Sequence, residues 1–296
     1  MTRIAPALVA LSAILAAAML WGTTGTLQSF LPDSRAPVVV GALRLAIGAL
    51  SLLLLAGLTR GAVAARHRVP KAPLLVAALG MAAYNLLFFA AVARAGVGLG
   101  TAVTIGSAPL WVAAYEGLVL RRAPGPRKAF GQALAIAGAA VLVLSGAQSG
   151  VSALGLLLAA AAGLSYAGYA LASSAMAAKA PAATIAASTF TLAALMTAPV
   201  FALLPWHWAL TGTAPATLLA LGVGSTGLAY ALYTWGLKSV PASTAVTLAL
   251  AEPLTAWALA LLVVGESVTP LKLTGAALLM AGLYVVTSNT RSQSKA

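Results

Sequence analysis

The chain has 296 residues, of which 61% are hydrophobic and only 7% are charged, and its formal net charge is +13. A soluble domain carries roughly a quarter to a third of charged residues on its surface. This composition excludes a water-soluble protein and indicates that lipid is the solvent. The lack of cysteine excludes disulfides, zinc–thiolate sites and thiol catalysis.

Ten apolar runs follow one another along the chain, and each has about the 20 residues that a helix needs to cross a bilayer. They cover residues 7–30, 36–58, 72–93, 98–119, 128–146, 152–176, 182–204, 215–237, 242–263 and 270–288. Long continuous runs of Ala, Leu and Gly are typical of packed membrane helices, whereas barrel strands alternate with a period of two. The sequence therefore predicts an all-α membrane protein with ten transmembrane helices.

The first run could be mistaken for a secretory signal, because Arg3 precedes it. The run is longer than a signal, and Trp21-Gly22-Thr23 lies inside it in place of a clean cleavage site. We therefore expect the first run to be retained as a helix.

Basic residues lie almost entirely in the loops between the runs, and they divide unequally between the two sides of the predicted membrane. One side carries Arg3, Arg60, Arg66, Arg68, Lys71, Arg121, Arg122, Arg127, Lys128, Lys179, Lys238, Arg291 and Lys295, and the other carries Arg35, Arg94 and Lys272. The positive-inside rule then predicts a multi-pass protein of the bacterial inner membrane with both termini in the cytoplasm. Nucleic-acid binding is not expected, since no basic face is interleaved with aromatic residues.

An internal repeat appears when 144 is added to a residue number. The offset relates Pro37 to Pro181, Gly80 to Gly224, Arg94 to Lys238, Pro109-Leu110 to Pro253-Leu254, Gly131 to Gly275 and Gly138 to Gly282. The halves are residues 1–146 and 147–296. Each holds five predicted helices, and because five is odd, the halves should lie in opposite orientations, as in many secondary transporters. A duplicated scaffold without transport activity is the alternative.

The chain resembles the drug/metabolite transporter superfamily of the EamA type, in two copies over nearly its whole length. The resemblance rests on Trp21-Gly22-Thr23, Arg44-Leu45-Ala46, Leu250-Ala251-Glu252-Pro253-Leu254 and Gly265-Glu266-Ser267. One departure is Arg121-Arg122, which stands where the first half of many members has a Gly-Glu pair. Within the superfamily the chain looks most like YddG-type exporters of aromatic and other amino acids. The resemblance implies a ten-helix bundle around a central cavity, without an ATPase domain.

Three ionisable residues within the predicted spans are candidates for function, because charge is costly inside a membrane. Glu252 has three interpretations: it couples proton flow to transport, binds a substrate amine, or is a structural partner of Arg44 or of backbone donors. Arg44 contacts a substrate carboxylate or pairs structurally. Because they are opposite charges in the same membrane, we predict that they pair. Glu116 is expected to reach toward Arg121 and Arg122.

Two prolines, Pro109 and Pro253, are predicted to interrupt the fourth and ninth helices at equivalent depths, as structural or gating elements. Symmetric interruptions favour a binding site near the middle of the membrane, although ordinary kinks repaired by neighbouring helices are the alternative.

Aromatic residues well inside the spans suggest a polar cavity, because a buried tyrosine hydroxyl needs a partner and a ring face can hold an ammonium group. Packing or lipid contact is the alternative for each one. The predicted cavity residues are Trp21, Tyr84, Asn85, Trp111, Tyr166, Tyr169, Tyr230, Tyr233 and Glu252.

No catalytic constellation is present, because His67 and His207 fall in loops and the four carboxylates are widely spaced. The sequence predicts no enzyme, no cofactor and no metal site. It predicts a secondary transporter that works by alternating access on a small molecule within the lipid bilayer. The resemblance favours export of amino acids, with drugs, nucleosides or passive diffusion as alternatives. The oligomeric state stays open, since small-residue faces could pack within the chain or against a second copy.

Overall fold

The computed structural model describes residues 4–33, 35–62, 64–144, 152–264 and 268–293, and within these ranges it contains helices and no strand. The predicted all-α class is therefore confirmed for the described part of the chain. The first half consists of α1 (Ile4–Gln28), α2 (Pro37–Leu58), the short 3-10 helix η1 (Ala64–Arg68), α3 (Lys71–Ala95), α4 (Val97–Leu118) and α5 (Pro126–Leu144).

The second half has the same number of predicted spans but more breaks. Its elements are α6 (Ala153–Met176), α7 (Ala182–Thr197), α8 (Val200–Leu203), η2 (His207–Leu210), α9 (Ala214–Leu219), η3 (Ala220–Leu228), α10 (Ala229–Gly236), α11 (Ala242–Leu248), α12 (Ala251–Leu259), η4 (Ala260–Val264) and α13 (Pro270–Gln293). The helices α9, η3 and α10 follow one another without a gap, and η3 is a π-helical stretch. Such stretches occur frequently at functional sites.

Nine helices in the described residues are long and apolar enough to cross a membrane. They correspond to nine of the ten predicted runs. The remaining run forms α4, a helix of 22 residues that is not among the nine. Its sequence contains Thr101, Thr104, Ser107 and Glu116.

The two prolines differ in their effect, which the sequence did not predict. Helix α4 continues through Pro109. At that level α6 packs closely, because Gly163 lies against the carbonyl of Thr104 and the side chain of Ser107. The ninth run does break, between α11 and α12. Pro253 then lies in the first turn of α12, where its missing N–H has no helical partner to lose.

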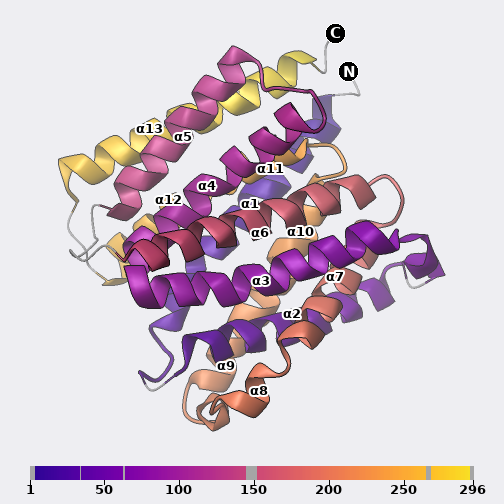
Figure 1. The fold of residues 1–296 in the computed structure, drawn as a ribbon, viewed down its shortest axis with the longest axis vertical. Helices are drawn as coiled ribbons and strands as arrows, with labels where there is room; N and C mark the ends of the chain where they lie inside the picture. Colours follow the sequence, from indigo (N-terminus) through magenta and orange to yellow (C-terminus); the bar gives the residue numbers. More distant parts are fainter. Residues whose placement is uncertain (1–3, 34, 63, 145–151, 265–267, 294–296) are drawn as a thin grey trace.

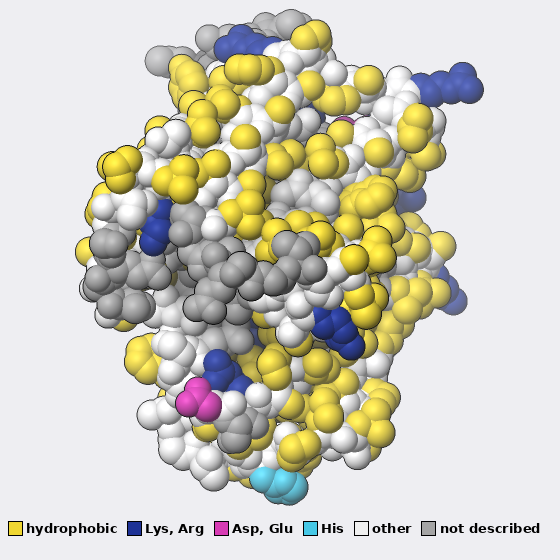
Figure 2. All heavy atoms as spheres, turned by 60° about the vertical axis from the view of Figure 1, so that its left-hand side comes forward, with side chains coloured by type: hydrophobic (Ala, Val, Ile, Leu, Met, Phe, Trp, Pro, Cys, Tyr) yellow, Lys and Arg dark blue, Asp and Glu magenta, His cyan; other side chains and the backbone are white. Residues whose placement is uncertain are grey.

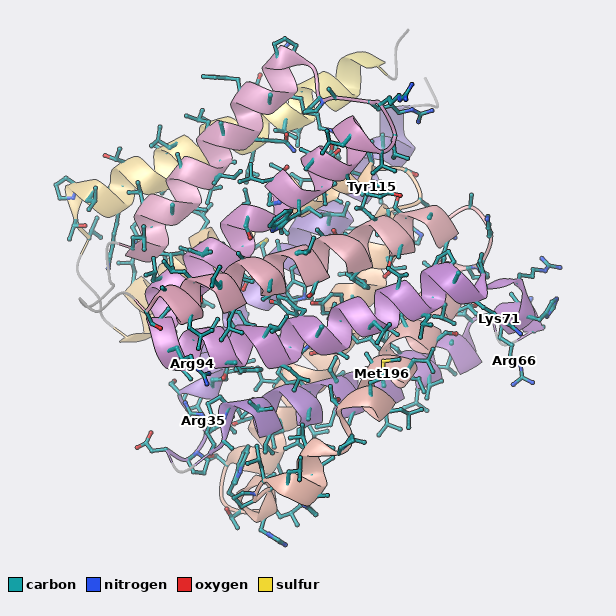
Figure 3. The ribbon with its side chains drawn as sticks, in the orientation of Figure 1. Arg35, Arg66, Lys71, Arg94, Tyr115 and Met196 are labelled. Carbon is teal, nitrogen blue, oxygen red and sulfur yellow. The ribbon has the colours of Figure 1, made fainter. Side chains whose placement is uncertain are left out.

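Charged residues mark two opposite ends of the helices. Figure 3 shows Arg66 and Lys71 at one end of α3, and Arg94 and Arg35 at the other. Figure 1 places the first turn of α1 and the last turns of α13 toward the end of Lys71. We call this the basic end, and the end with Asp33, Arg35 and Arg94 the cavity end. Thr184 at the start of α7 donates to the carbonyl of Ala62, so α7 also begins at the basic end.

Helices α5 and α13 pack side by side along one edge of the molecule (Figure 1). A Cβ added to Gly282 would lie 2.7 Å from the carbonyl oxygen of Gly131, and one added to Gly138 would lie 2.7 Å from that of Gly275. Because the lower residue number of one helix meets the higher number of the other, the two helices run antiparallel. Small residues let the backbones approach this closely.

The outer surface suits lipid. Many large apolar side chains are exposed, among them Leu54, Leu58, Leu118, Phe130, Leu157 and Tyr284. Figure 2 shows hydrophobic side chains spread over the visible face, with Lys and Arg few and scattered. A soluble protein rarely exposes so continuous an apolar surface. The structure is that of a multi-pass membrane protein.

Candidate functional site

A cavity of about 700 Å³ extends from the interior of the helix bundle to the cavity end. This size is within the usual range of small-molecule sites. Its outer part is lined by Gln28, Asp33, Arg35 and Lys272, and Asp33 is fully exposed to solvent. The cavity therefore opens at the cavity end, while its inner part is closed by the packed core.

Six of the nine predicted cavity residues line this cavity. They are Trp21, Tyr84, Asn85, Tyr166, Tyr230 and Glu252. Arg44 and Pro253, predicted to be structural or gating residues, line it as well, whereas Pro109 does not. The tertiary structure thus brings together side chains from five separate stretches of the sequence, on α1, α2, α3, α6 and the segment from η3 to α12.

Glu252 lies in the first turn of α12, directly after the break that follows α11. A carboxylate is favoured there because the helix dipole presents positive charge at its N-terminus. Helix α1 approaches this turn closely, since a Cβ at Gly22 would lie 2.7 Å from the carbonyl oxygen of Glu252. The glycine of Trp21-Gly22-Thr23 therefore allows α1 to pack against the turn that carries the carboxylate.

Arg44 extends from α2 into the same cavity, and its Nε is buried without a hydrogen-bond partner. Both Arg44 and Glu252 belong to the described residues, and they do not form the ion pair that we predicted. The two charges come from different helices, Arg44 from α2 and Glu252 from α12, and both line the cavity.

Aromatic rings form the floor of the cavity. The ring centroid of Trp21 lies 4.8 Å from that of Tyr230 and 6.2 Å from that of Tyr166. Tyr84 lies 5.6 Å from Tyr166. These separations are those of favourable aromatic pairs, so the rings support one another as a rigid apolar surface beside the two charges.

Asn85 is held in place by its own helix. Its amide nitrogen donates to the carbonyl of Met81 at 3.0 Å, one turn earlier on α3. Because the nitrogen is engaged, the side chain can offer its carbonyl oxygen as an acceptor.

Three predicted cavity residues lie elsewhere. Trp111 is 39% exposed on the outside of α4, where its indole nitrogen donates to the carbonyl of Ala160. Helical spacing alone did not reveal that this face of α4 is turned outward. Tyr169 and Tyr233 are buried in the core and do not line the cavity.

Sequence reasoning missed several residues of the cavity. Thr104, Lys272 and Asp33 line it, and Trp257, which lies in a predicted span, does too. The hydroxyl of Thr104 and the indole nitrogen of Trp257 are buried without partners. A usable signal for Thr104 was its position on α4 just before Pro109, but nothing in the local sequence distinguished Lys272 from an ordinary loop cation.

A polar contact between α5 and α11 was also not foreseen. The ammonium group of Lys128 donates to the hydroxyl of Ser243 at 2.5 Å. Gln132 donates to the hydroxyl of Thr247 at 3.0 Å. These bonds fix α11, the short helix that precedes Glu252. The motif Gly265-Glu266-Ser267 and the terminal cations Arg3 and Lys295 lie outside the described residues.

Comparisons with known proteins agree with a duplicated transporter. The sequence pattern of the EamA-like transporter family matches residues 8–144 and again residues 153–288. The uncharacterized transporter YwfM of Bacillus subtilis (strain 168) is 39% identical over 283 residues, covering 96% of this chain and 95% of that protein.

A second relative and a solved structure extend the comparison. The threonine/homoserine exporter RhtA of Escherichia coli (strain K12) is 30% identical over 287 residues, covering 95% of this chain and 92% of that protein. A protein crystal structure with 24% sequence identity superimposes with a TM-score of 0.83 over 96% of this chain and 98% of the other. At that identity the superposition shows a shared fold.

Proposed function

The chain belongs to the EamA-like transporter family, and from this premise we propose that it is a secondary transporter that exports small zwitterionic metabolites, above all amino acids, by alternating access. Its relatives are transporters and not enzymes. The drug/metabolite transporter resemblance seen in the sequence is confirmed at the level of this family. The proposal concerns substrate, direction and mechanism.

The observation that carries the proposal is a pair of opposite charges in one cavity that do not contact each other. Arg44 and Glu252 both line the cavity, and neither is paired with another described side chain in an ion pair. Buried charges are costly unless they are paired. An α-amino acid brings a carboxylate for the guanidinium and an ammonium for the carboxylate, so one ligand satisfies both groups. A simple amine or a simple acid would satisfy only one.

The walls around these charges suit the rest of an amino acid. Trp21 and Tyr230 supply ring faces, which attract an ammonium group as well as apolar carbon. Asn85 and Thr104 supply polar groups for a hydroxyl-bearing side chain. The name of RhtA, a threonine/homoserine exporter, favours small polar amino acids as substrates. The likeness to YddG-type exporters favours aromatic ones, and the cavity has room for either.

The proposed architecture is ten transmembrane helices in two inverted repeats, residues 1–146 and 147–296. The antiparallel packing of α5 and α13 supports it, because these helices are related by the offset of 144 and contribute the paired glycines 131, 138, 275 and 282. With both termini in the cytoplasm of a bacterial inner membrane, the cavity opens outward in this structure. That is the state in which an exporter releases its substrate.

The test is exchange of labelled threonine in liposomes that contain the purified protein, loaded with unlabelled threonine. Trans-stimulated, saturable exchange identifies a carrier, whereas a passive facilitator that works as a channel shows none. We expect Arg44→Gln and Glu252→Gln to weaken apparent affinity about 30-fold, since loss of one partner of a buried charge pair costs roughly 2 kcal/mol or more. Arg94→Gln is the matched control, because Arg94 is exposed and donates to the carbonyl of Ala90 on its own helix.

Two analogues of threonine test the zwitterion directly. 1-Amino-2-propanol lacks the carboxylate and 3-hydroxybutyrate lacks the ammonium, and we expect both to compete poorly with threonine. Equal competition by either analogue, or transport of a nucleoside or cationic drug in place of amino acids, would contradict the substrate assignment. Exchange that is unchanged in both Gln variants would contradict the roles of Arg44 and Glu252.

A further inference from the structure

A cluster of cations lies at the basic end, where α2 leads into η1 and α3. Figure 3 shows Arg66 and Lys71 at this end of the molecule, beyond the body of the helix bundle. The cluster, which we call the basic platform, consists of the exposed residues Arg60, Arg66, Arg68 and Lys71. The sequence from residue 59 to residue 71 contains no Asp or Glu. None of the four cations forms an ion pair with another described residue.

The backbone that carries the platform is fixed to the helix bundle. Gly61 has a φ of 75°, which allows a sharp turn directly after α2. Ala62, Ala65 and Val69 are only 0%, 6% and 6% exposed, so they pack inward between the exposed cations. The carbonyl oxygen of Ala62 also accepts a hydrogen bond of 2.8 Å from the hydroxyl of Thr184 on α7. The cations are therefore presented from a fixed surface and not from a loose loop.

The repeat shows that this fold of the loop does not need the cations. Adding 144 to the platform positions gives Leu204, Leu210, Gly212 and Pro215, none of which is charged. The second-half loop contains the 3-10 helix η2, as the first-half loop contains η1. Ala65 corresponds to Ala209, and the two are 6% and 5% exposed. The packing residue is thus shared between the halves, whereas the positive charge is confined to the first.

Apolar side chains flank the platform on both of the helices that it joins. Leu54 and Leu58, in the last turns of α2, are 71% and 86% exposed. Leu75 and Leu79, in the first turns of α3, are each 50% exposed. Residues four apart lie on one face of a helix, so each pair forms an apolar strip that ends near the cations. In a bilayer these strips contact acyl chains, and the platform then lies at the level of the headgroups.

We propose that the basic platform binds the headgroup of an anionic phospholipid, such as phosphatidylglycerol, while the acyl chains of that lipid lie along the leucine strips of α2 and α3. Lysine and arginine next to a membrane surface attract anionic lipids, and a fixed cluster confines this attraction to one place. A soluble anion would match the cations but would leave the leucine strips without a partner. The contact is separate from the substrate cavity and does not depend on which substrate is carried.

Competition between two lipids tests the platform. The purified protein in an uncharged detergent is mixed with equal amounts of dioleoyl-phosphatidylglycerol and dioleoyl-phosphatidylcholine, and the bound lipids are counted by native mass spectrometry. Arg66→Gln/Arg68→Gln removes two cations of the platform. Arg121→Gln/Arg122→Gln is the matched control, because it removes two exposed cations that follow α4. Arg66→Lys/Arg68→Lys keeps the charge of the platform.

We expect the native protein to prefer phosphatidylglycerol, and Arg66→Gln/Arg68→Gln to lower this preference by about tenfold or more, since each cation near an anionic surface contributes roughly a factor of five. The control and Arg66→Lys/Arg68→Lys should each retain most of the preference. A native protein without preference, or an equal loss in the control, would overturn the proposal. If inorganic phosphate at the same concentration displaces phosphatidylglycerol, the platform takes free phosphate and the assignment to lipid fails.

Discussion

Gly282→Ala tests how closely the two repeat-related helices α5 and α13 approach each other. The new Cβ would lie 2.7 Å from the carbonyl oxygen of Gly131 and closer still to the backbone nitrogen of Ala135. The Ala135 nitrogen would lie 2.4 Å from the new Cβ and ordinary contact begins at 3.4 Å, so the helices must separate by about 1 Å at this point. The obstacle on both sides is backbone, which cannot rotate away as a side chain can.

The expected cost follows from two terms. Overpacking of a close interface costs about 1–3 kcal/mol, and a gap of 0.5–1 Å forfeits roughly a quarter to a half of the dispersion attraction of the atoms beside it. At about 2–4 °C per kcal/mol for a chain of this order of size, the apparent Tm should fall by about 3–10 °C.

The assay is thermal unfolding of the purified protein in detergent, followed by the loss of the monodisperse peak in size-exclusion chromatography. Gly168→Ala is the matched control, because Gly168 is also inside a helix but a Cβ there would meet nothing within 4 Å. It should be neutral or slightly stabilising, by up to about 1 kcal/mol from helix propensity. An equal Tm for the two variants would refute the close packing of α5 on α13.

Two further predictions concern the elements around Glu252. Lys128→Met and Ser243→Ala should each destabilise the protein, because each removes the same charge-assisted hydrogen bond. The double variant should therefore lose less stability than the sum of the two single losses, by a coupling energy of about 1–2 kcal/mol. Strictly additive Tm losses would contradict that bond. Gly22→Ala should raise the apparent KM for threonine about tenfold by displacing the first turn of α12. Gly168→Ala should not, because a Cβ there also meets nothing within 4 Å and Gly168 does not line the cavity. Unchanged exchange kinetics in both variants would argue against the positioning role of Gly22.

Much of the site could be predicted, because few residues within the apolar runs of this chain are ionisable or polar. Arg44 and Glu252 stand out as charges in apolar runs, and both do line the cavity. The structure gives no ion pair between these two described residues, because scarcity predicts that two charges share a region but not how close they come. Trp111 shows the same limit: its depth in a span was foreseen, but the outward face of α4 was decided by packing against α6.

The membrane explains what the sequence determined by itself. A bilayer requires long apolar helices and tolerates charge mainly outside them, so hydropathy predicted the spans, and the fixed offset of 144 predicted the duplication that the family pattern confirms. The tertiary structure alone decided which helix breaks: α4 continues through Pro109, while the ninth run separates into α11 and α12 before Pro253. That choice depends on contacts between helices distant in sequence, such as Gly163 against Thr104, and such contacts leave no local pattern.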